Sequence, residues 1–405
     1  MQVNQRGHIN LSIFSSRTDW NLTPNALHQL LEEKRKRGES ILDLTESNPT
    51  RCGFSHNPEI LQALSSNRSL LYEPDPRGLL AARKSIADHY NRPGVLIDPS
   101  NIFLTASTSE AYTHLFRLLC NPGANVLVPK PSYPLFDYLC ALNDVEVRYY
   151  RLRYDDEWQI DLDSIEDSID ASTRALLLVH PNNPTGSFVK KTEKDAVAKI
   201  IWKHNLALIV DEVFSEFSFE DVADSYGSFV AEKEPLVFTL NGISKLLGLP
   251  QMKLAWITIS GESTLAHDAV DRLEIICDTY LSVGTPIQQA LPVLLDNGRR
   301  ITEEIKKRIK TNYCSLRSMT ANSSASLLRT DGGWNAIVRL PGIVSDESWA
   351  LRTLEDYNVF VHPGHFFEIE QDACIVVSLL PEESTFSNGI DRLLASVRST
   401  ISLSV

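Results

Sequence analysis

The central part of the chain alternates between compact apolar runs and stretches with the spacing of amphipathic helices. Each run is apolar at consecutive positions, which is typical of strands buried on both faces of a parallel sheet. Alternation of such strands with helices predicts an α/β domain in which helices cover both faces of the sheet. Seven runs predict a mainly parallel seven-stranded sheet: 101–106 (NIFLTA), 124–130 (ANVLVPK), 145–150 (VEVRYY), 175–180 (ALLLVH), 206–213 (LALIVDEV), 236–241 (LVFTLN) and 254–260 (LAWITIS).

The two ends of the chain show a different order of elements, which predicts a smaller α+β domain. We expect the N-terminal segment 1–56 and the C-terminal third, 299–405, to form this domain, and residues 57–298 to form the large one. The elements expected in the small domain are a helix at 24–37, a short strand at 41–44 (ILDL), a charged helix at 299–310, and strands at 334–340 (WNAIVRL), 359–364 (VFVHPG) and 374–380 (CIVVSLL).

The composition of the 405-residue chain suits a globular enzyme and disfavours several kinds of partner. With 43% hydrophobic and 22% charged residues, the chain can bury a sizeable core. A formal net charge of −13 argues against nucleic acid, because phosphate backbones attract concentrated Lys and Arg. The six cysteines lie far apart, without the short spacings of metal or redox motifs, so no metal site is predicted. We expect neither a signal peptide nor a membrane span, and therefore a cytoplasmic protein.

Three polar residues stand just after apolar runs, where open α/β sheets bind their ligands. Asn183 follows ALLLVH, Asp211 closes LALIVD, and Lys245 follows LVFTLN. Taken singly, each is better explained as a turn former, a helix cap or a surface residue. Together they suit a pyridine aldehyde cofactor. A desolvated lysine can condense with the aldehyde, a carboxylate can keep the ring nitrogen protonated, and an amide can donate to the ring phenolate.

The start of a predicted helix offers a place for a phosphate group. After NIFLTA the chain runs through Ser107, Thr108, Ser109 and Glu110 into a helical stretch. A helix N-terminus presents free N–H groups and a positive dipole end to an anion. The alternative is a plain capping box between Ser107 and Glu110, which this segment alone would favour. Lys253, eight residues beyond Lys245, makes the phosphate interpretation the better one.

The ordered motifs resemble the class I/II aminotransferases, which are fold-type I pyridoxal-phosphate enzymes. The resemblance runs from about Leu42 to Leu380 through YEPDPRGLLAARKSIA, LTASTSEA, PKPSYPLF, HPNNPTG, IVDEVF and SKLLGLPQMKLAW. It implies transfer of an amino group between small amino and 2-oxo acids through an aldimine on Lys245, which would also shuttle the proton at the substrate Cα. It further implies a homodimer whose sites lie at the subunit interface.

The resemblance also implies a role for each matching residue around pyridoxal 5′-phosphate. Asp211 would pair with the pyridine nitrogen, Asn183 would reach the phenolate, and Tyr133 would stack on the ring. Tyr72 would reach the phosphate from the partner subunit. The other phosphate contacts implied are Ser107, Thr108, Ser109, Ser244 and Lys253.

Three positions depart from the family pattern. Phe214 stands where a tyrosine usually donates to the ring oxygen, and Lys253 replaces an arginine, exchanging a bidentate fork for a point charge. Val376 stands where a late-strand arginine usually clamps the substrate carboxylate. The best local substitute is Arg51 in ESNPTRCG, for which a surface position or a structural salt bridge is the alternative. Further candidates in the small domain are Arg329 and Arg339.

Two other functions remain open from the sequence. The same cofactor and fold serve lyases and decarboxylases, because the fate of the substrate carbanion depends on which bond stands perpendicular to the ring. The absent late-strand arginine favours this alternative. A regulatory sensor fused to a DNA-binding module is disfavoured, because the segment before Asn21 is too short for a helix-turn-helix domain and the chain is acidic.

Overall fold

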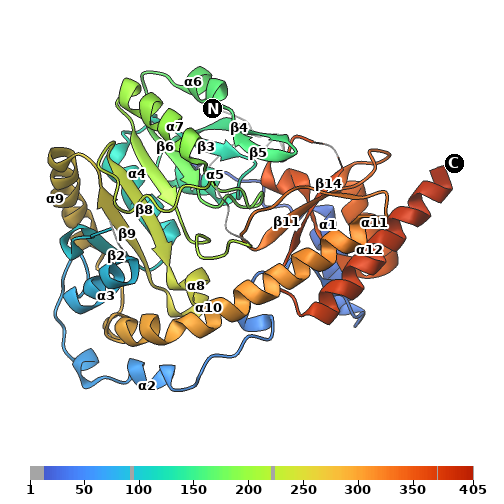
Figure 1. The fold of residues 1–405 in the computed structure, drawn as a ribbon, viewed down its shortest axis with the longest axis horizontal. Coiled ribbons are helices and arrows are strands. Elements are labelled where there is room, and N and C mark those ends of the chain that lie inside the picture. The colour runs from blue at the N-terminus through green and yellow to red at the C-terminus, as the bar shows by residue number, and fades with distance from the viewer. Residues whose placement is uncertain (1–12, 92–94, 220–223, 372, 405) are drawn as a thin grey trace.

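The computed structural model describes residues 13–91, 95–219, 224–371 and 373–404 and contains one large sheet (Figure 1). The first twelve residues of the expected N-terminal segment lie outside this description. The strand order of the large sheet is β2-β9-β8-β7-β6-β3-β4-β5. Its strands are β2 (Ile102–Thr105), β3 (Asn125–Lys130), β4 (Glu146–Asp155), β5 (Glu157–Ile160), β6 (Thr173–Val179), β7 (Ala207–Asp211), β8 (Val237–Gly242) and β9 (Ala255–Ser260).

The mainly parallel sheet is confirmed, but it has eight strands where seven were expected. The pairs from β8 through β7, β6 and β3 to β4 are parallel, whereas β9 runs antiparallel to both β8 and β2. The additional strand, β5, pairs antiparallel with the end of β4. Asp156 between them has a left-handed φ of 56°, which allows a tight reversal. Four residues, EWQI, are too short and too polar to show a strand pattern, so only pairing with β4 defines this strand.

Helices cover both faces of the large sheet, as expected. On one face, α4, α5 and α9 pack against alternate strand residues such as Ile209 and Phe238. On the other face, α6 and α7 pack against Leu208 and Val210. The helices of the described chain are α1 (Ala26–Lys36), α2 (Ile60–Leu64), α3 (Leu80–Tyr90), α4 (Thr108–Leu119), α5 (Leu135–Leu142), α6 (Leu162–Ser168), α7 (Lys191–His204), α8 (Ile243–Leu246), α9 (Ser263–Tyr280), α10 (Thr285–Thr320), α11 (Asp346–Tyr357) and α12 (Glu383–Ser404). Within the part of the chain described, no helix is both long and apolar enough to cross a lipid bilayer.

The long helix α10 runs through position 298/299, where the boundary between the two domains was expected. Its buried residues recur every three or four positions from Ile287 to Leu316, so one apolar stripe extends along most of its 36 residues. Gly298 lies on this stripe against Leu247, where an added Cβ would come within 2.2 Å of the leucine side chain. The helix therefore joins the two ends of the molecule without a break (Figure 1). The division into domains stays a prediction.

Two smaller sheets hold the C-terminal part, and one of them recruits the N-terminal segment. A four-stranded sheet has the order β10-β11-β14-β13, and a two-stranded parallel sheet joins β1 to β12 through Leu42 and Val359. The N-terminal segment therefore packs with the C-terminal third, as expected. These strands are β1 (Leu42–Asp43), β10 (Ser326–Leu327), β11 (Asn335–Arg339), β12 (Val359–Phe360), β13 (His362–Pro363) and β14 (Cys374–Ser378).

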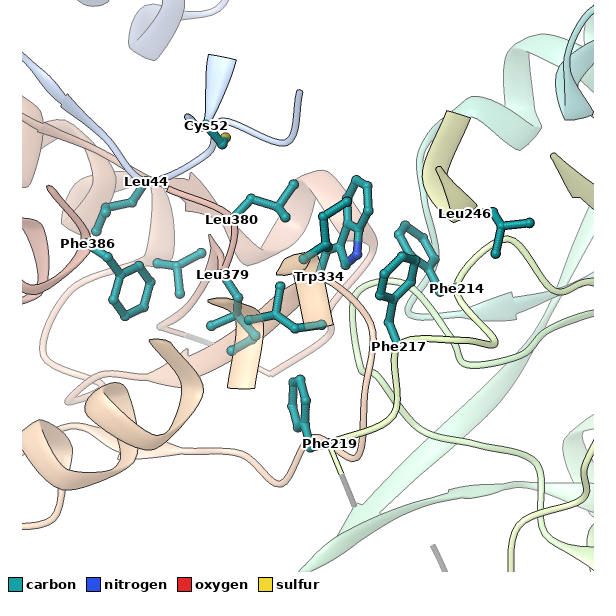
Figure 2. Packing of buried hydrophobic residues seen from close by; sticks show 14 of the residues in the cluster. Leu44, Cys52, Phe214, Phe217, Phe219, Leu246, Trp334, Leu379, Leu380 and Phe386 are labelled. Atoms are coloured by element: carbon teal, nitrogen blue, oxygen red, sulfur yellow. The ribbon is translucent and has the colours of Figure 1, made fainter. Parts of the chain in front are cut away.

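One hydrophobic core extends from the C-terminal part to the carboxyl edge of the large sheet (Figure 2). Leu44 and Phe386 lie at one end of this cluster, and Phe214 and Leu246 lie at the other. Trp334, which is 1% exposed, lies between them against Phe214. Because Leu246 and Phe214 adjoin polar residues after β8 and β7, this core holds the sheet edge and the small sheets in one packed unit.

Candidate active site

The three polar residues expected at strand ends lie along one edge of the large sheet. Asp211 is the last residue of β7, Asn183 follows β6, and Lys245 lies on α8 just after β8. Strand register places Asp211 beside Val179 of β6 and Leu240 of β8. Because these three strands are parallel neighbours, the segments that carry the polar side chains leave the sheet side by side.

Lys245 is half-buried between aromatic rings. Its Nζ lies 5.1 Å from the ring centroid of Trp334 and 5.8 Å from that of Phe214. Burial lowers the pKa of the Lys245 amine, and the negative charge of Asp211 opposes this shift. A lowered pKa increases the neutral fraction of the amine, which is the form that attacks a carbonyl carbon.

Asp211 is 8% exposed and is held by two hydrogen-bond donors. The Tyr112 hydroxyl donates to its Oδ2 at 2.9 Å, and the backbone N–H of Val213 donates to its Oδ1 at 3.0 Å. Burial raises the pKa of Asp211 to about 6, although these donors and Lys245 favour the carboxylate. A carboxylate in such surroundings is stabilised by a cationic partner placed beside it.

Tyr112 was not among the residues singled out from the sequence. It lies on α4 within the buried face that also carries Ala111, Leu115 and Phe116. A tyrosine in a buried helical stripe needs a partner for its hydroxyl, and this requirement was the available signal. The partner itself, Asp211, is 99 residues away and becomes evident only from the fold.

The N-terminus of α4 is capped by Ser107 and Glu110, in an arrangement close to the capping box that the sequence left open, but with Glu110 bonded to the residue before the N-cap. Ser107 Oγ accepts from the N–H of Glu110 at 3.1 Å, and Glu110 Oε2 accepts from the N–H of Ala106 at 2.7 Å. Thr108 and Ser109 form the first turn of the helix, half-buried beside the sheet edge. The capping contacts involve the N–H groups of Ala106 and Glu110, so they are compatible with an anion at those of Thr108 and Ser109. The same helix therefore brings both a helix N-terminus and the Asp211 partner Tyr112 to this region.

Ser244 and Lys253 flank this region from the next strands. Ser244 is half-buried in the first turn of α8, next to Lys245. Lys253 is exposed, has a left-handed φ of 52°, and precedes β9. The first residue of β9, Ala255, pairs with Thr105 of β2 on one side and Gly242 of β8 on the other. Lys253 therefore lies at the same sheet edge as α4 and α8.

The two tyrosines with expected cofactor roles are exposed in the single chain. Tyr133, between β3 and α5, is 48% exposed, and Tyr72 is 78% exposed. Neither ring is packed into the hydrophobic core of its own chain. The two residues are therefore free to contact a cofactor or another subunit.

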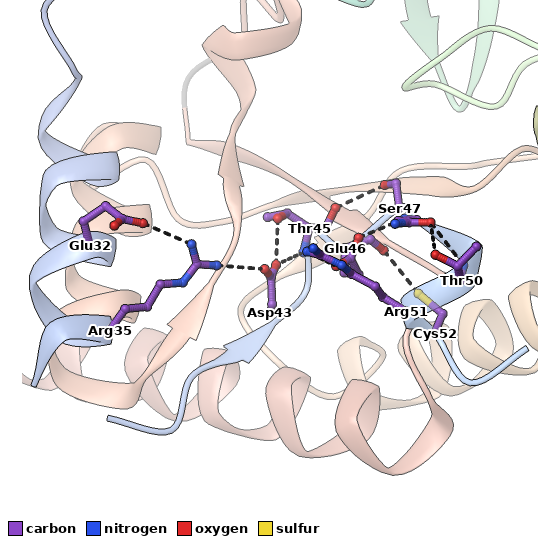
Figure 3. Close-up of polar contacts among 10 residues, drawn as sticks. Glu32, Arg35, Asp43, Thr45, Glu46, Ser47, Thr50, Arg51 and Cys52 are labelled. Carbon is purple, nitrogen blue, oxygen red and sulfur yellow. Dashed lines mark hydrogen bonds and ion pairs between the residues drawn. The ribbon is translucent and has the colours of Figure 1, made fainter. Parts of the chain in front are cut away.

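The structure also places Arg51 and Val376, the two positions considered from the sequence for the substrate carboxylate. Val376 lies in β14, is 1% exposed and pairs with Ile337 of β11. Arg51 is at the end of a short 3-10 helix, with 75% of its side chain exposed (Figure 3). Its Nη1 lies 3.7 Å from Glu46 Oε2, so the salt bridge considered as an alternative is present in this state.

The residues at this edge fit pyridoxal phosphate chemically. The buried Asp211 suits a cationic ring nitrogen, the desolvated Lys245 suits a carbonyl carbon, and the α4 N-terminus suits a phosphate. Trp334 adds a buried Nε1 that has no hydrogen-bond partner within the chain described. The sequence patterns did not single out Trp334 or Asn335, whose side-chain Nδ2 donates to Asn183 Oδ1 at 2.7 Å.

Comparisons with known proteins agree with this chemistry. The family described as aminotransferase class I and II matches residues 38–393. The chain is 29% identical over 280 residues to the glutamate-pyruvate aminotransferase AlaA of Escherichia coli, covering 68% of this chain and 69% of that protein. It is 34% identical over 268 residues to an S-alkyl-thiohydroximate lyase of Arabidopsis thaliana, covering 64% and 57% of the respective chains.

A solved structure shares the fold over nearly the whole chain. The alanine aminotransferase of Pyrococcus furiosus superposes with a TM-score of 0.86 at 22% identity, covering 95% of this chain and 100% of that one. The family match spans well over half of the sequence. The chain therefore belongs to the class I and II aminotransferases and is a pyridoxal-phosphate-dependent transaminase.

Proposed function

We propose that Lys245 holds the cofactor covalently and that this enzyme transfers amino groups between small amino acids and 2-oxo acids. The observation that carries the proposal is the placement of a desolvated lysine and a buried carboxylate just after, and at the end of, adjacent strands. Bound pyridoxal phosphate supplies an electrophilic carbonyl carbon and a ring that accepts electrons. The remaining chemistry belongs to side chains of this protein.

Lys245 has two tasks in this proposal. Its neutral amine would hold the cofactor covalently, and its Nζ would accept and return the proton of the substrate Cα. Burial beside Phe214 and Trp334 lowers the pKa of the amine and so favours its neutral form for both tasks.

Asp211 and Asn183 would orient and polarise the ring. The Asp211 carboxylate, which Tyr112 and Val213 hold in place, would accept from the protonated ring nitrogen. Asn183 would donate to the ring oxygen. Tyr133 would pack against the ring, and Ser107, Thr108, Ser109, Ser244 and Lys253 would hold the phosphate. Lys253 is exposed and has a flexible four-carbon side chain. It would therefore supply positive charge to the phosphate without fixing the orientation of that group.

The active form in this proposal is a homodimer in which Tyr72 reaches the phosphate of the partner subunit. Support comes from a group of exposed apolar side chains around Tyr72 in the same segment. Leu70 is 85% exposed and Leu71 is 57% exposed. Exposed apolar side chains that adjoin one another in a chain are typical of contact surfaces between subunits.

A reducing compartment such as the cytoplasm is the proposed location. All six cysteines lie in the described part of the chain, where none of them forms a disulfide, and four of them are buried. Burial raises the pKa of the Cys140 thiol and of the Cys52 thiol, the latter to about 12, so these thiols are unreactive core residues. Dispersed, protonated thiols are typical of proteins that do not depend on disulfides.

A lyase acting on the same cofactor is the second candidate. Two observations favour it: Val376 replaces the expected carboxylate clamp, and one relative is named as an S-alkyl-thiohydroximate lyase. The transaminase has the stronger support, because relatives named as glutamate-pyruvate and alanine aminotransferases share this sequence over most of its length.

A single-turnover screen separates the two. The purified holoenzyme is mixed with each amino acid in turn, without a 2-oxo acid acceptor, and the cofactor spectrum and released products are recorded. A transaminase converts the visible band of the bound cofactor to that of its amine form and releases about one 2-oxo acid per subunit. Continuous release of pyruvate and ammonia without an acceptor would instead establish the lyase.

We predict that Arg51 anchors the substrate carboxylate by turning away from Glu46. Among the described residues its exposed guanidinium is held only by a 3.7 Å ion pair with Glu46, which is weak at the surface. Arg51→Ala is expected to lower kcat/KM about ten- to a hundred-fold, as for loss of a charge-assisted contact. Arg51→Lys recovers part of the loss because lysine lacks the planar fork. Cofactor affinity stays unchanged.

The control is Arg37→Ala, which removes another exposed arginine that pairs with a carboxylate in the same N-terminal segment. It is expected to leave kcat/KM at the wild-type value. Full activity of Arg51→Ala would place the anchor elsewhere. Arg329, which pairs with Asp331 and Glu157, and Arg339, which donates to Gln371, would then be tested.

A further inference from the structure

Asn335 contacts one of the residues assigned to the cofactor, although 152 positions separate them in the sequence. Its Nδ2 donates to Asn183 Oδ1 at 2.7 Å. A side-chain amide carries its oxygen and its NH2 on opposite sides of the same planar group. Engaging Oδ1 of Asn183 therefore leaves its Nδ2 directed away from Asn335.

The backbone around Asn335 is held tightly against the segment that carries Asn183. An added Cβ at Gly186 would come within 2.2 Å of the carbonyl oxygen of Gly332, so this approach requires glycine. The N–H of Gly333 donates to the carbonyl of Phe217 at 2.9 Å. The first residue of β11, Asn335, is paired with Ser378 of β14. The contacts of Gly332 and Gly333 before Asn335, together with its pairing to β14, therefore fix the backbone position of Asn335.

The register of β11 and β14 puts Asn335 near the position of the missing arginine. Asn335 pairs with Ser378 and Ile337 pairs with Val376, so Asn335 and Val376 are diagonal neighbours on one face. A neutral amide thus stands at the start of β11 opposite Ser378, two residues before Ile337, which pairs with Val376. Phe214, in turn, offers no hydroxyl to the ring oxygen, so the assigned donation rests on Asn183.

We propose that Asn335 is a positioning residue that fixes the side-chain amide of Asn183 so that its NH2 faces the cofactor ring oxygen. The inference rests on the role proposed above for Asn183. Asn335 itself touches neither the substrate nor the reacting atoms. Its function is to choose one of two amide orientations, because the opposite orientation would direct Oδ1 at an electron-rich oxygen.

The test is a spectral titration of the holoenzyme, which reports the pKa of the chromophore formed by Lys245 and the cofactor. A hydrogen bond to the deprotonated form lowers this pKa, so its loss raises it. Asn335→Asp can only accept, which favours the reversed Asn183 amide, and it is expected to raise the chromophore pKa by about one unit. Asn335→Leu removes the donor without adding charge and is expected to give a smaller rise.

Asn183→Ala and the double variant separate the possible failures. Asn183→Ala alone is expected to raise the pKa, and adding the uncharged Asn335→Leu to it is expected to cause no further rise. If Asn183→Ala leaves the pKa unchanged, the proposed role of Asn183 fails. If Asn183→Ala raises it but the Asn335 variants do not, or if Asn335→Leu acts equally without Asn183, the positioning role is wrong.

A buried asparagine far from the site provides the matched control. Asn125, at the start of β3, donates to Asp170 and accepts from Thr173 at the opposite end of the sheet. Asn125→Ala is expected to lower the melting temperature without changing the chromophore pKa. A pKa shift in this control as large as that of Asn335→Leu would mean that general loosening explains the effect, and would overturn the proposal.

Discussion

Replacing Lys245 with alanine is expected to reduce turnover by at least about 10⁴-fold, the upper range for loss of a general acid–base group. The variant loses both the covalent bond to the cofactor and the Nζ that carries the proton at the substrate Cα. Cofactor should still bind, though more weakly, because Asp211 and the α4 N-terminus are retained. Single-turnover rates and equilibrium titration with pyridoxal phosphate measure the two effects separately.

Chemical labelling gives a readout that is independent of activity. Borohydride reduction of the wild-type holoenzyme should fix the cofactor on the peptide that contains Lys245, since burial lowers the pKa of that amine. Lys307→Ala, which removes an exposed lysine from α10, is the control and should be labelled and active like the wild type. Recovery of the reduced cofactor on another lysine would refute the assignment.

Replacing Asp211 with asparagine is expected to lower kcat by about 10²–10³-fold, the usual loss when one preorganised electrostatic contact is removed. Asparagine matches the shape of aspartate but cannot hold a proton on the ring nitrogen. Tyr112→Phe removes one donor to the carboxylate and leaves the charge, so its effect should be much smaller. Steady-state kinetics of the two variants against wild type measure the difference.

The melting temperature of Asp211→Asn shows whether the variant loses activity through its chemistry or through unfolding. Burial raises the pKa of Asp211 from 3.8 to about 6 in the protein without cofactor. A carboxyl group with a raised pKa in the folded state costs stability as the pH rises through that range, because ionisation is easier after unfolding. At pH 7 the cofactor-free Asp211→Asn protein should therefore melt at the wild-type temperature or above it. A lower melting temperature would attribute the lost activity to misfolding.

Cofactor affinity should depend on pH through the same group. A cationic ring nitrogen favours the Asp211 carboxylate, so binding lowers its pKa below the value of about 6 found without cofactor. Affinity is then highest above pH 6 and falls as the pH drops below it, because binding must first release a proton. Asp211→Asn lacks this dependence. An identical pH profile in both proteins would mean that Asp211 does not face the ring nitrogen.

Local patterns in the sequence determined most of the fold and the chemistry of the site. All seven apolar runs contain strands of the large sheet. They could be predicted because a strand buried on both faces is apolar at consecutive positions, which can be seen in the sequence itself. The parallel order then placed Asn183, Asp211 and Lys245 at one edge, since each follows its strand directly. The capping contacts of Ser107 and Glu110 are equally local. The apolar spacing that continues along α10 was also present in the sequence, and reading it from Ile287 onwards would have shown the helix crossing position 298.

Tertiary structure alone decided which distant side chains meet. Strand β5 is defined by its pairing with β4, because its own four residues show no strand pattern. Tyr112 finds Asp211 across 99 residues, and Asn335 finds Asn183 across 152. Arg51 was predicted to bind the substrate carboxylate because of its charge and its place in an N-terminal loop. Its ion pair with Glu46 depends on the conformation of that loop. The periodicity of strands and helices depends on residues that are close in the sequence, so it could be predicted. Side-chain hydrogen bonds depend on angstrom-scale positions that the packing of the whole chain sets, so they could not be predicted.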